Sequence, residues 1–205
     1  MTEPWLERWE EGRIGWHEAG GNASLHKYWS ASGKRVLVPL CGKTPDLLWI
    51  EAQGNEVVGV ELSDIAARAF FEENSIGYTT HDAGLIAYEG ADRSITIYCG
   101  DFFDFEVARF DACYDRGSLI TLPPDARPAY AEHLDSLLTH DASRLLITVD
   151  YDDTIATGPP FAVSADEVLG YWPALKLIDR YDDIDNGPPK FRNAGLTAMY
   201  ESVWR

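Results

Sequence analysis

The sequence predicts an α/β fold in which buried parallel strands alternate with helices. Residues 36–40 and 57–60 are continuous apolar runs, which are typical of parallel strands covered on both faces. Between them, residues 46–53 carry Leu47, Leu48 and Ile50 at helical spacing, and Gly54 is placed to end the helix. The stretch 35–61 is therefore predicted to form a strand, a helix and a second strand.

Glu61 follows the second strand directly, at the edge of the sheet where such folds bind their ligands. A carboxylate there can accept both hydrogen bonds of a ribose diol. Gly42-Lys43-Thr44 is similar to the end of a phosphate-binding loop, but Leu37 occupies the position where that loop requires glycine. A dinucleotide site needs three glycines in this turn, and only Gly42 is present. A nucleoside without a pyrophosphate remains, and S-adenosylmethionine is the commonest such ligand on this fold; the alternative is a plain structural unit with a solvent-facing Glu61.

The remaining elements follow from the same patterns. Helices are expected over residues 6–11, 23–29, 64–73, 126–139 and 164–171. Strands are expected over residues 95–99, 110–114, 145–149, 175–181 and 197–204, and a loop or small hairpin over 75–94. Ser63 is expected to cap the helix 64–73, whose inner face would carry Ile65, Ala66, Ala69 and Phe70. Ser164 and Glu167 are expected to form a capping box.

Composition limits the class of protein. A chain of 205 residues with no linker or repeat is predicted to form one domain over 1–205. The formal net charge of −17 argues against a nucleic-acid partner, because phosphate contacts need clustered Lys and Arg. The same charge is compatible with adaptation to a salty cytoplasm. No apolar run approaches the length of a membrane span, so no membrane association is expected.

The cellular compartment and the metal content follow from the start of the chain and from its Cys and His residues. The start of the sequence lacks the basic and apolar regions of an export signal, which predicts a cytoplasmic protein. Cys41, Cys99 and Cys113 are expected to be reduced thiols in the core. The five histidines are dispersed, so no metal site is expected.

Acidic and basic side chains at strand ends supply the candidate chemistry. Asp101 follows the strand 95–99 and would face an adenine amino group, or else cap a helix. Asp115 and Arg116 follow the strand 110–114. A guanidinium there would lower the pKa of a thiol and hold the thiolate, and Asp115 or Asp152 would take the proton. The alternative for Arg116 is a structural ion pair with Asp115.

Four of the seven tryptophans lie in residues 1–34: Trp5, Trp9, Trp16 and Trp29. This segment is expected either to pack on the sheet as a lid or to line a cofactor pocket, where indole faces attract a sulfonium cation.

Several sequence blocks resemble the thiopurine S-methyltransferase family, in the family's order and over nearly the whole chain. These blocks are Trp5-x-x-x-Trp9-x-x-Gly-Arg-Ile-Gly-Trp16-His, residues 38–43 (Val-Pro-Leu-Cys-Gly-Lys), 57–63 (Val-Val-Gly-Val-Glu-Leu-Ser), 99–104 (Cys-Gly-Asp-Phe-Phe-Asp), 114–117 (Tyr-Asp-Arg-Gly) and 158–161 (Gly-Pro-Pro-Phe). The resemblance implies a class I methyltransferase fold, a three-layer Rossmann-like arrangement whose seven-stranded, mostly parallel sheet has an antiparallel last strand.

The resemblance also implies roles for individual residues. S-adenosylmethionine, which leaves as S-adenosylhomocysteine, would contact Trp5, Trp9, Leu40, Gly42, Glu61, Asp101, Phe102 and Arg116. Arg116 matches the family arginine near cofactor and substrate, and Asp115 beside it is added as a catalytic candidate from the acid–base argument above. The residues expected to contact the acceptor are Trp16, Tyr151, Phe161, Lys190 and Arg192. Trp16 stands where the family usually has Phe, and the loop with Lys190 and Arg192 matches the family poorly.

The acceptor expected from these features is a small thiol or sulfide-like nucleophile, with aromatic thiols and thiopurines also accepted. Selenium or tellurium oxyanions and halides are the alternatives within methyl transfer. A catalytically idle module that senses S-adenosylmethionine is the alternative of another class; an apolar acceptor pocket lined by Trp16, Tyr151 and Phe161 favours the enzyme, because a sensor needs no second site. A monomer is expected.

Overall fold

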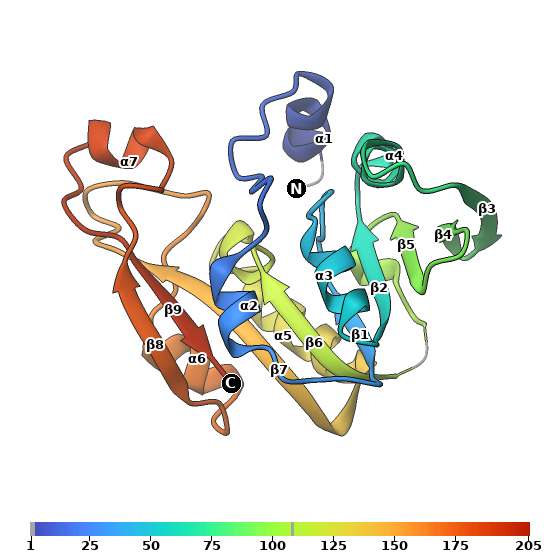
Figure 1. The fold of residues 1–205 in the computed structure, drawn as a ribbon. Helices are drawn as coiled ribbons and strands as arrows, with labels where there is room; N and C mark the ends of the chain where they lie inside the picture. The colour runs from blue at the N-terminus through green and yellow to red at the C-terminus, as the bar shows by residue number, and fades with distance from the viewer. Residues whose placement is uncertain (1–2, 108) are drawn as a thin grey trace. The chain divides into compact units, whose positions relative to one another are not determined.

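The computed structural model, drawn in Figure 1, describes residues 3–107 and 109–205. The chain divides into two compact units. The first unit comprises Met1–Tyr114 with Leu137–Ala142, and the second comprises Asp115–Ser136 with Ser143–Arg205. The chain passes between the units within strand β6 (Phe110–Arg116) and within strand β7 (Leu138–Asp150). The single domain expected over 1–205 stays a prediction.

Four parallel strands form the centre of the first unit, in the order β5-β2-β1-β6. Their bounds are β1 (Arg35–Val38), β2 (Glu56–Glu61), β5 (Ile95–Cys99) and β6. The apolar residues of β1 and β2 are buried, as expected for strands covered on both faces. Beside β5, a hairpin of β3 (Tyr78–Ala83) and β4 (Leu85–Gly90) continues the sheet in antiparallel pairing.

Helices α1 (Glu3–Glu10) and α2 (Ala23–Tyr28) precede β1. Helix α3 (Asp46–Ala52) connects β1 to β2, α4 (Asp64–Glu73) follows β2, and a 3-10 turn η1 at Phe102–Asp104 follows β5. The bounds expected for α4 are confirmed, and the Ser63 hydroxyl accepts a hydrogen bond from the backbone N–H of Ala66 at 3.3 Å. The α2 cap is Asn22, whose side-chain oxygen accepts from the N–H groups of Ser24 and Leu25.

The second unit is built on antiparallel strands in the order β7-β9-β8, with β8 at Leu177–Asp182 and β9 at Tyr200–Trp204. Its helices are α5 (Arg127–Leu137), α6 (Ala165–Tyr171) and α7 (Pro189–Asn193), with a 3-10 turn η2 at Leu119–Thr121. One apolar cluster in this unit consists of Val149, Tyr151, Ala156, Phe191, Leu196 and Met199. These side chains come from β7, α7 and the loops near them, so the cluster holds the loops to the sheet.

The predicted α/β class is confirmed, and so is the antiparallel last strand, because β9 runs antiparallel to both neighbours. The predicted count of seven strands is wrong: the described residues contain nine, since 78–90 form the β3–β4 hairpin. The strand expected over 36–40 ends at Val38, because Leu40 has a left-handed backbone with φ of 45°. Strand β6 runs on to Arg116, so Asp115 and Arg116 lie inside the strand end.

Two side-chain expectations need correction. The buried face of α4 carries Ala66, Ala67, Phe70 and Phe71, whereas Ile65 is 41% exposed. Ser164 caps α6 as expected, but the Glu167 carboxylate binds the buried guanidinium of Arg127 and does not close the capping box. Within residues 3–107 and 109–205, no helix combines the length and apolar character needed to cross a membrane.

Candidate functional site

Glu61 lies at the carboxyl end of β2 and joins two loops through its carboxylate. Its Oε2 atom accepts a hydrogen bond from the backbone N–H of Gly42 at 2.8 Å, and Oε1 accepts one from Ser63 N–H at 2.8 Å. The side chain is largely buried, at 7% exposure, so it is not the solvent-facing group of the structural alternative. Burial raises the pKa of the Glu61 carboxyl, and the Ser63 and Gly42 N–H groups oppose that rise.

The turn after β1 lies close against β2. Cys41 donates its backbone N–H to the carbonyl of Val60 at 3.0 Å. Its sulfur lies over Gly59, where a Cβ atom would be only 2.6 Å from Sγ. Leu40 and Gly42 both adopt left-handed conformations, with φ of 45° and 57°. This close packing presents the Gly42 N–H to Glu61.

Trp9 covers the same turn from the amino-terminal segment. A Cβ atom on Gly42 would lie 3.5 Å from the Trp9 ring, so the indole rests on the glycine. Trp16 packs edge-to-face on Trp9 and on Trp5, with ring centroids 5.9 and 5.1 Å apart. The Arg8 guanidinium lies 4.6 Å from the Trp5 ring centroid. The three tryptophans thus form one cluster beside the turn.

Asp101 and Phe102 lie at the end of the next strand. The Gly100 N–H donates to the Glu61 carbonyl at 2.9 Å, which continues the β2–β5 pairing to this point. Asp101 Oδ1 accepts from the Phe103 N–H at 3.0 Å and caps η1, so the helix-cap interpretation of Asp101 is confirmed. Phe102 is buried beside it. Glu61 and Asp101 therefore occupy neighbouring strand ends.

These residues of the first unit fit a nucleoside that bears a sulfonium. The Glu61 carboxylate accepts backbone N–H groups of Gly42 and Ser63, and the Leu62 N–H also stabilises its charge; a carboxylate with these partners can still accept from a ribose hydroxyl. Asp101 Oδ2 accepts no hydrogen bond from the described residues, which suits an adenine amino group. Indole faces suit a cation. No group of His, Cys, Asp and Glu in the described part of the chain has the arrangement of a metal site.

Asp115 and Arg116 end β6 and belong to the second unit. Asp115 is 2% exposed and accepts hydrogen bonds from the Tyr130 hydroxyl at 2.7 Å and from the N–H groups of Ser118 and Leu119. Burial raises the pKa of Asp115, and these donors oppose the rise. These contacts of Asp115 fix the residues 118–119 that follow β6. Arg116 is half-buried.

Tyr151 and Phe161 stand at the two ends of one loop, which hydrogen bonds to main-chain carbonyls hold in place. The Tyr151 hydroxyl donates to the Pro160 carbonyl at 2.6 Å, and the Phe161 N–H donates to the Ile120 carbonyl at 2.6 Å. Tyr151 also packs on Phe191, with ring centroids 4.9 Å apart. Asp152, the other proton acceptor considered, is exposed and accepts from the Thr154 N–H and hydroxyl.

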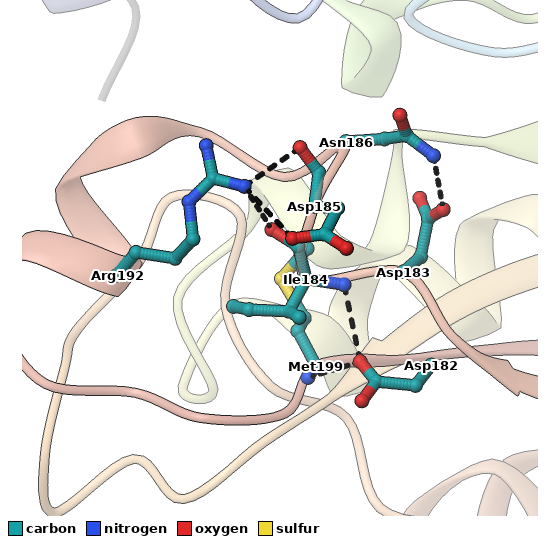
Figure 2. A network of polar contacts seen from close by, with 7 residues as sticks. All are labelled: Asp182, Asp183, Ile184, Asp185, Asn186, Arg192 and Met199. Atoms are coloured by element: carbon teal, nitrogen blue, oxygen red, sulfur yellow. Dashed lines mark hydrogen bonds and ion pairs between the residues drawn. The ribbon is translucent and has the colours of Figure 1, made fainter.

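Lys190 and Arg192 bind main-chain carbonyls of nearby loops. The Lys190 ammonium donates to the Thr157 carbonyl at 3.1 Å. Arg192 donates to the carbonyls of Ile184 and Asp185 at 3.3 and 2.8 Å and pairs with the Asp185 carboxylate, as Figure 2 shows. Arg192 therefore holds α7 to the loop at residues 184–185, and Lys190 holds it to the loop at Thr157; their role toward an acceptor stays a prediction.

Sequence reasoning brought together the residues of the donor side but missed what anchors them. Trp9, Gly42 and Glu61 lie in contact, with Leu40 and Asp101 beside them and Trp5 and Trp16 in the indole cluster. The expected acceptor residues Tyr151, Phe161, Lys190 and Arg192 lie in the second unit. The missed residues are Asp46, Asn22 and Tyr114, which form a buried network; an aspartate opening a helix after a turn was the one available indication.

Comparison with known proteins gives one consistent result. The family model described as thiopurine S-methyltransferase matches residues 1–205. A thiopurine S-methyltransferase of Bordetella petrii is 44% identical, over 100% of this chain and 97% of its own length. One from Nitrosospira multiformis is 42% identical, over 98% and 96%.

Among solved structures, the Burkholderia thailandensis 1,6-didemethyltoxoflavin-N1-methyltransferase, with bound 1,6-didemethyltoxoflavin and S-adenosylhomocysteine, has a similar fold. Its TM-score is 0.65 at 18% identity, with 100% of this chain and 86% of that chain covered. At this identity the likeness concerns the fold.

Proposed function

Because the chain belongs to the thiopurine S-methyltransferase family and is an S-adenosylmethionine-dependent methyltransferase, we propose that it methylates the sulfur of a small thiol or of hydrogen sulfide. The observation that supports this most is the match of the thiopurine S-methyltransferase family model over residues 1–205. Aromatic thiols and thiopurines are further acceptors in this proposal, since the curated relatives carry that name.

The donor side of the site consists of the first-unit residues. Glu61 accepts the ribose hydroxyls with the acceptor capacity that its backbone partners leave. Asp101 and Phe102 hold the adenine, with Asp101 Oδ2 as the acceptor for its amino group. Leu40 and Gly42 line the turn, and Trp5 and Trp9 cover the cation with their indole faces.

The chemistry requires little proton transfer. Bound S-adenosylmethionine supplies a methyl group already activated by its sulfonium. A lone pair of the acceptor sulfur forms the new C–S bond, the donor C–S bond breaks with its electrons going to the donor sulfur, and S-adenosylhomocysteine leaves. The protein contributes alignment and exclusion of water.

Arg116 stabilises the thiolate form of the acceptor, because a guanidinium beside a thiol lowers its pKa and pairs with the anion. Asp115 acts through Arg116: its carboxylate is occupied by Tyr130, Ser118 and Leu119, which suits a residue that positions the strand end. The residues that this proposal assigns to the acceptor are Trp16 in the first unit and Tyr151, Phe161, Lys190 and Arg192 in the second.

Oxyanions of selenium or tellurium and halides are the competing acceptors, and a non-catalytic sensor of S-adenosylmethionine is the competing class. The test is incubation of the purified protein with S-adenosylmethionine and a panel of small thiols, sulfide, thiopurines, selenite, tellurite and iodide. Methylated sulfur products are expected. If methylation occurs only with the oxyanions or halides, the acceptor assignment is wrong; if the donor binds and no acceptor is methylated, the sensor replaces the enzyme. A cytoplasmic monomer remains our expectation.

A further inference from the structure

The amino-terminal segment 3–34 carries the indole cluster, and buried polar groups hold its second half to the sheet. The Asn55 side chain donates to the Ala31 carbonyl at 3.1 Å and accepts from the Lys34 N–H at 3.1 Å. These bonds fix the end of the segment that leads into β1. Residues further toward α1 need a second attachment.

Asp46 provides that attachment. Its side chain is 2% exposed. Oδ1 accepts a hydrogen bond from the backbone N–H of Asn22 at 2.9 Å, and Oδ2 accepts one from the Tyr114 hydroxyl at 2.8 Å. A Cβ atom at position 21 would lie 2.7 Å from Oδ1, so Gly21 allows the segment to approach the carboxylate.

Asn22 transmits this attachment to both sides of the segment. Its side-chain oxygen caps α2 through the N–H groups of Ser24 and Leu25, and its side-chain nitrogen donates to Glu18 at 3.4 Å. The cap is buried together with Ser24 and Leu25. A buried carboxylate therefore fixes the point where α2 begins and where the chain turns toward Trp16 and Trp9.

Asp46 also lies next to two other parts of the candidate site. It is the first residue of α3, directly after the turn that contains Gly42, and its backbone N–H donates to the Thr44 hydroxyl at 3.3 Å. Tyr114 precedes Arg116 by two residues on β6. The Asp46 side chain thus links the amino-terminal segment to the strand that carries Arg116, and the Asp46 backbone binds the turn after β1.

We infer that Asp46 is a positioning residue: it fastens the amino-terminal segment, and with it the Trp9 indole, over the turn that contains Gly42. The inference rests on the proposed donor site but makes a separate statement about the free protein. Asp46 does not touch the donor; it acts by removing motion of residues 3–21 that donor binding would otherwise have to restrict.

The variant that tests this is Asp46→Asn, with Tyr114→Phe to remove only one of the two contacts. Asparagine keeps the shape of the side chain but has one acceptor oxygen, so one of the two bonds is lost or reversed. Thr148→Val is the matched control: it removes a buried hydrogen bond, Trp204 Nε1–H to Thr148 at 3.1 Å, in the second unit.

Two measurements on the full-length protein separate positioning from stability. Amide hydrogen exchange of residues 3–21 should be faster by roughly tenfold in free Asp46→Asn, and binding of S-adenosylhomocysteine should weaken by roughly tenfold. Saturating ligand should restore the protection, and kcat at saturating donor should stay near that of the unaltered protein. Thr148→Val should lose stability with neither effect.

The inference is overturned if Asp46→Asn exchanges residues 3–21 at the unaltered rate, or if Thr148→Val produces the same pair of changes. If Asp46→Asn does not fold, Tyr114→Phe decides by the same two measurements. Failure of the unaltered protein to bind S-adenosylhomocysteine would instead contradict the proposed donor site, and the exchange rates of the free proteins would still decide the role of Asp46.

Discussion

The Glu61 carboxylate and the backbone N–H of Gly42 are joined by a hydrogen bond of 2.8 Å, so the end of β2 holds the turn after β1 in place. The carboxylate has a structural role in the free protein and a binding role in the proposed complex. Substitutions at Glu61 must therefore be judged on stability and on donor affinity together.

Glu61→Ala should weaken S-adenosylhomocysteine binding by roughly 10- to 100-fold, because hydrogen bonds to a charged group are lost. Isothermal titration calorimetry measures the affinity, and thermal unfolding without ligand shows the structural part. Glu72→Gln, at an exposed position of α4, is the control and should bind normally. A folded Glu61→Ala protein with unaltered affinity would remove Glu61 from the donor site.

Donor affinity should fall as the pH is lowered through the pKa of Glu61. Burial places this pKa above the ordinary 4.5, and hydroxyl donors bind the charged form, so binding favours loss of the proton. Affinity should therefore rise with pH to a plateau, with a midpoint above 4.5. Titrations at several pH values check this; the slope should be absent in Glu61→Ala, and a flat profile in the unaltered protein would contradict the assignment.

Arg116→Ala should reduce kcat/KM for thiol acceptors by about 100-fold, since the positive charge that stabilises the reacting thiolate is removed. Steady-state kinetics at saturating donor measure it. Arg109→Ala, at an exposed position before β6, should keep its activity. A loss of unfolding free energy in Arg116→Ala that accounts for the lost activity would favour the structural ion pair instead.

Tyr130→Phe should lower the free energy of unfolding by about 1–3 kcal/mol, because the buried Asp115 carboxylate loses a donor. Tyr200→Phe is the control, since its hydroxyl makes no hydrogen bond to any residue that the structure describes. Urea unfolding monitored by circular dichroism measures both.

The loss of unfolding free energy in Tyr130→Phe should depend on pH. The folded pKa of Asp115 lies above its unfolded value, so the native state binds more protons between the two and stability falls as pH rises through that window. Removing the hydroxyl raises the folded pKa further, so the loss should be larger near pH ~7 than below the unfolded value of 3.8. A loss independent of pH would mean that Asp115 is not charged in the folded protein at neutral pH.

Gly59→Ala should destabilise the protein by about 1–3 kcal/mol, since the new methyl group would lie 2.6 Å from the Cys41 sulfur. Cys41→Ala removes that sulfur, so Gly59→Ala should cost much less in the Cys41→Ala background. Urea unfolding of the two single variants and the double variant completes the cycle. Additive losses would mean that the crowding comes from elsewhere, such as Ile97.

Local patterns predicted the elements that local chemistry determines. The bounds of α4 follow from its serine cap and apolar spacing, and those of β5 from a short apolar run. The buried face of α4 differs from the predicted one because Phe71 points inward. Phe71 packs on the Tyr78 and Tyr88 rings of the β3–β4 hairpin. That packing is set by tertiary contacts.

The candidate site divides in the same way. Glu61 was identifiable because an acid directly follows the apolar run 57–60. The Asp46–Tyr114 hydrogen bond could not be predicted, because it joins residues 68 positions apart and the sequence around each residue does not indicate the other. Likewise, the hydrogen bond from the Tyr130 hydroxyl to Asp115 depends on where α5 lies in the folded protein.

The edge-to-face contacts among Trp5, Trp9 and Trp16 give the protein an optical property of its own. Indoles packed in a fixed asymmetric arrangement produce aromatic circular dichroism, which disappears when the packing is lost. Because Trp9 rests on Gly42, departure of α1 from the turn would change the near-ultraviolet spectrum without any attached dye. The covering segment carries its own spectroscopic reporter.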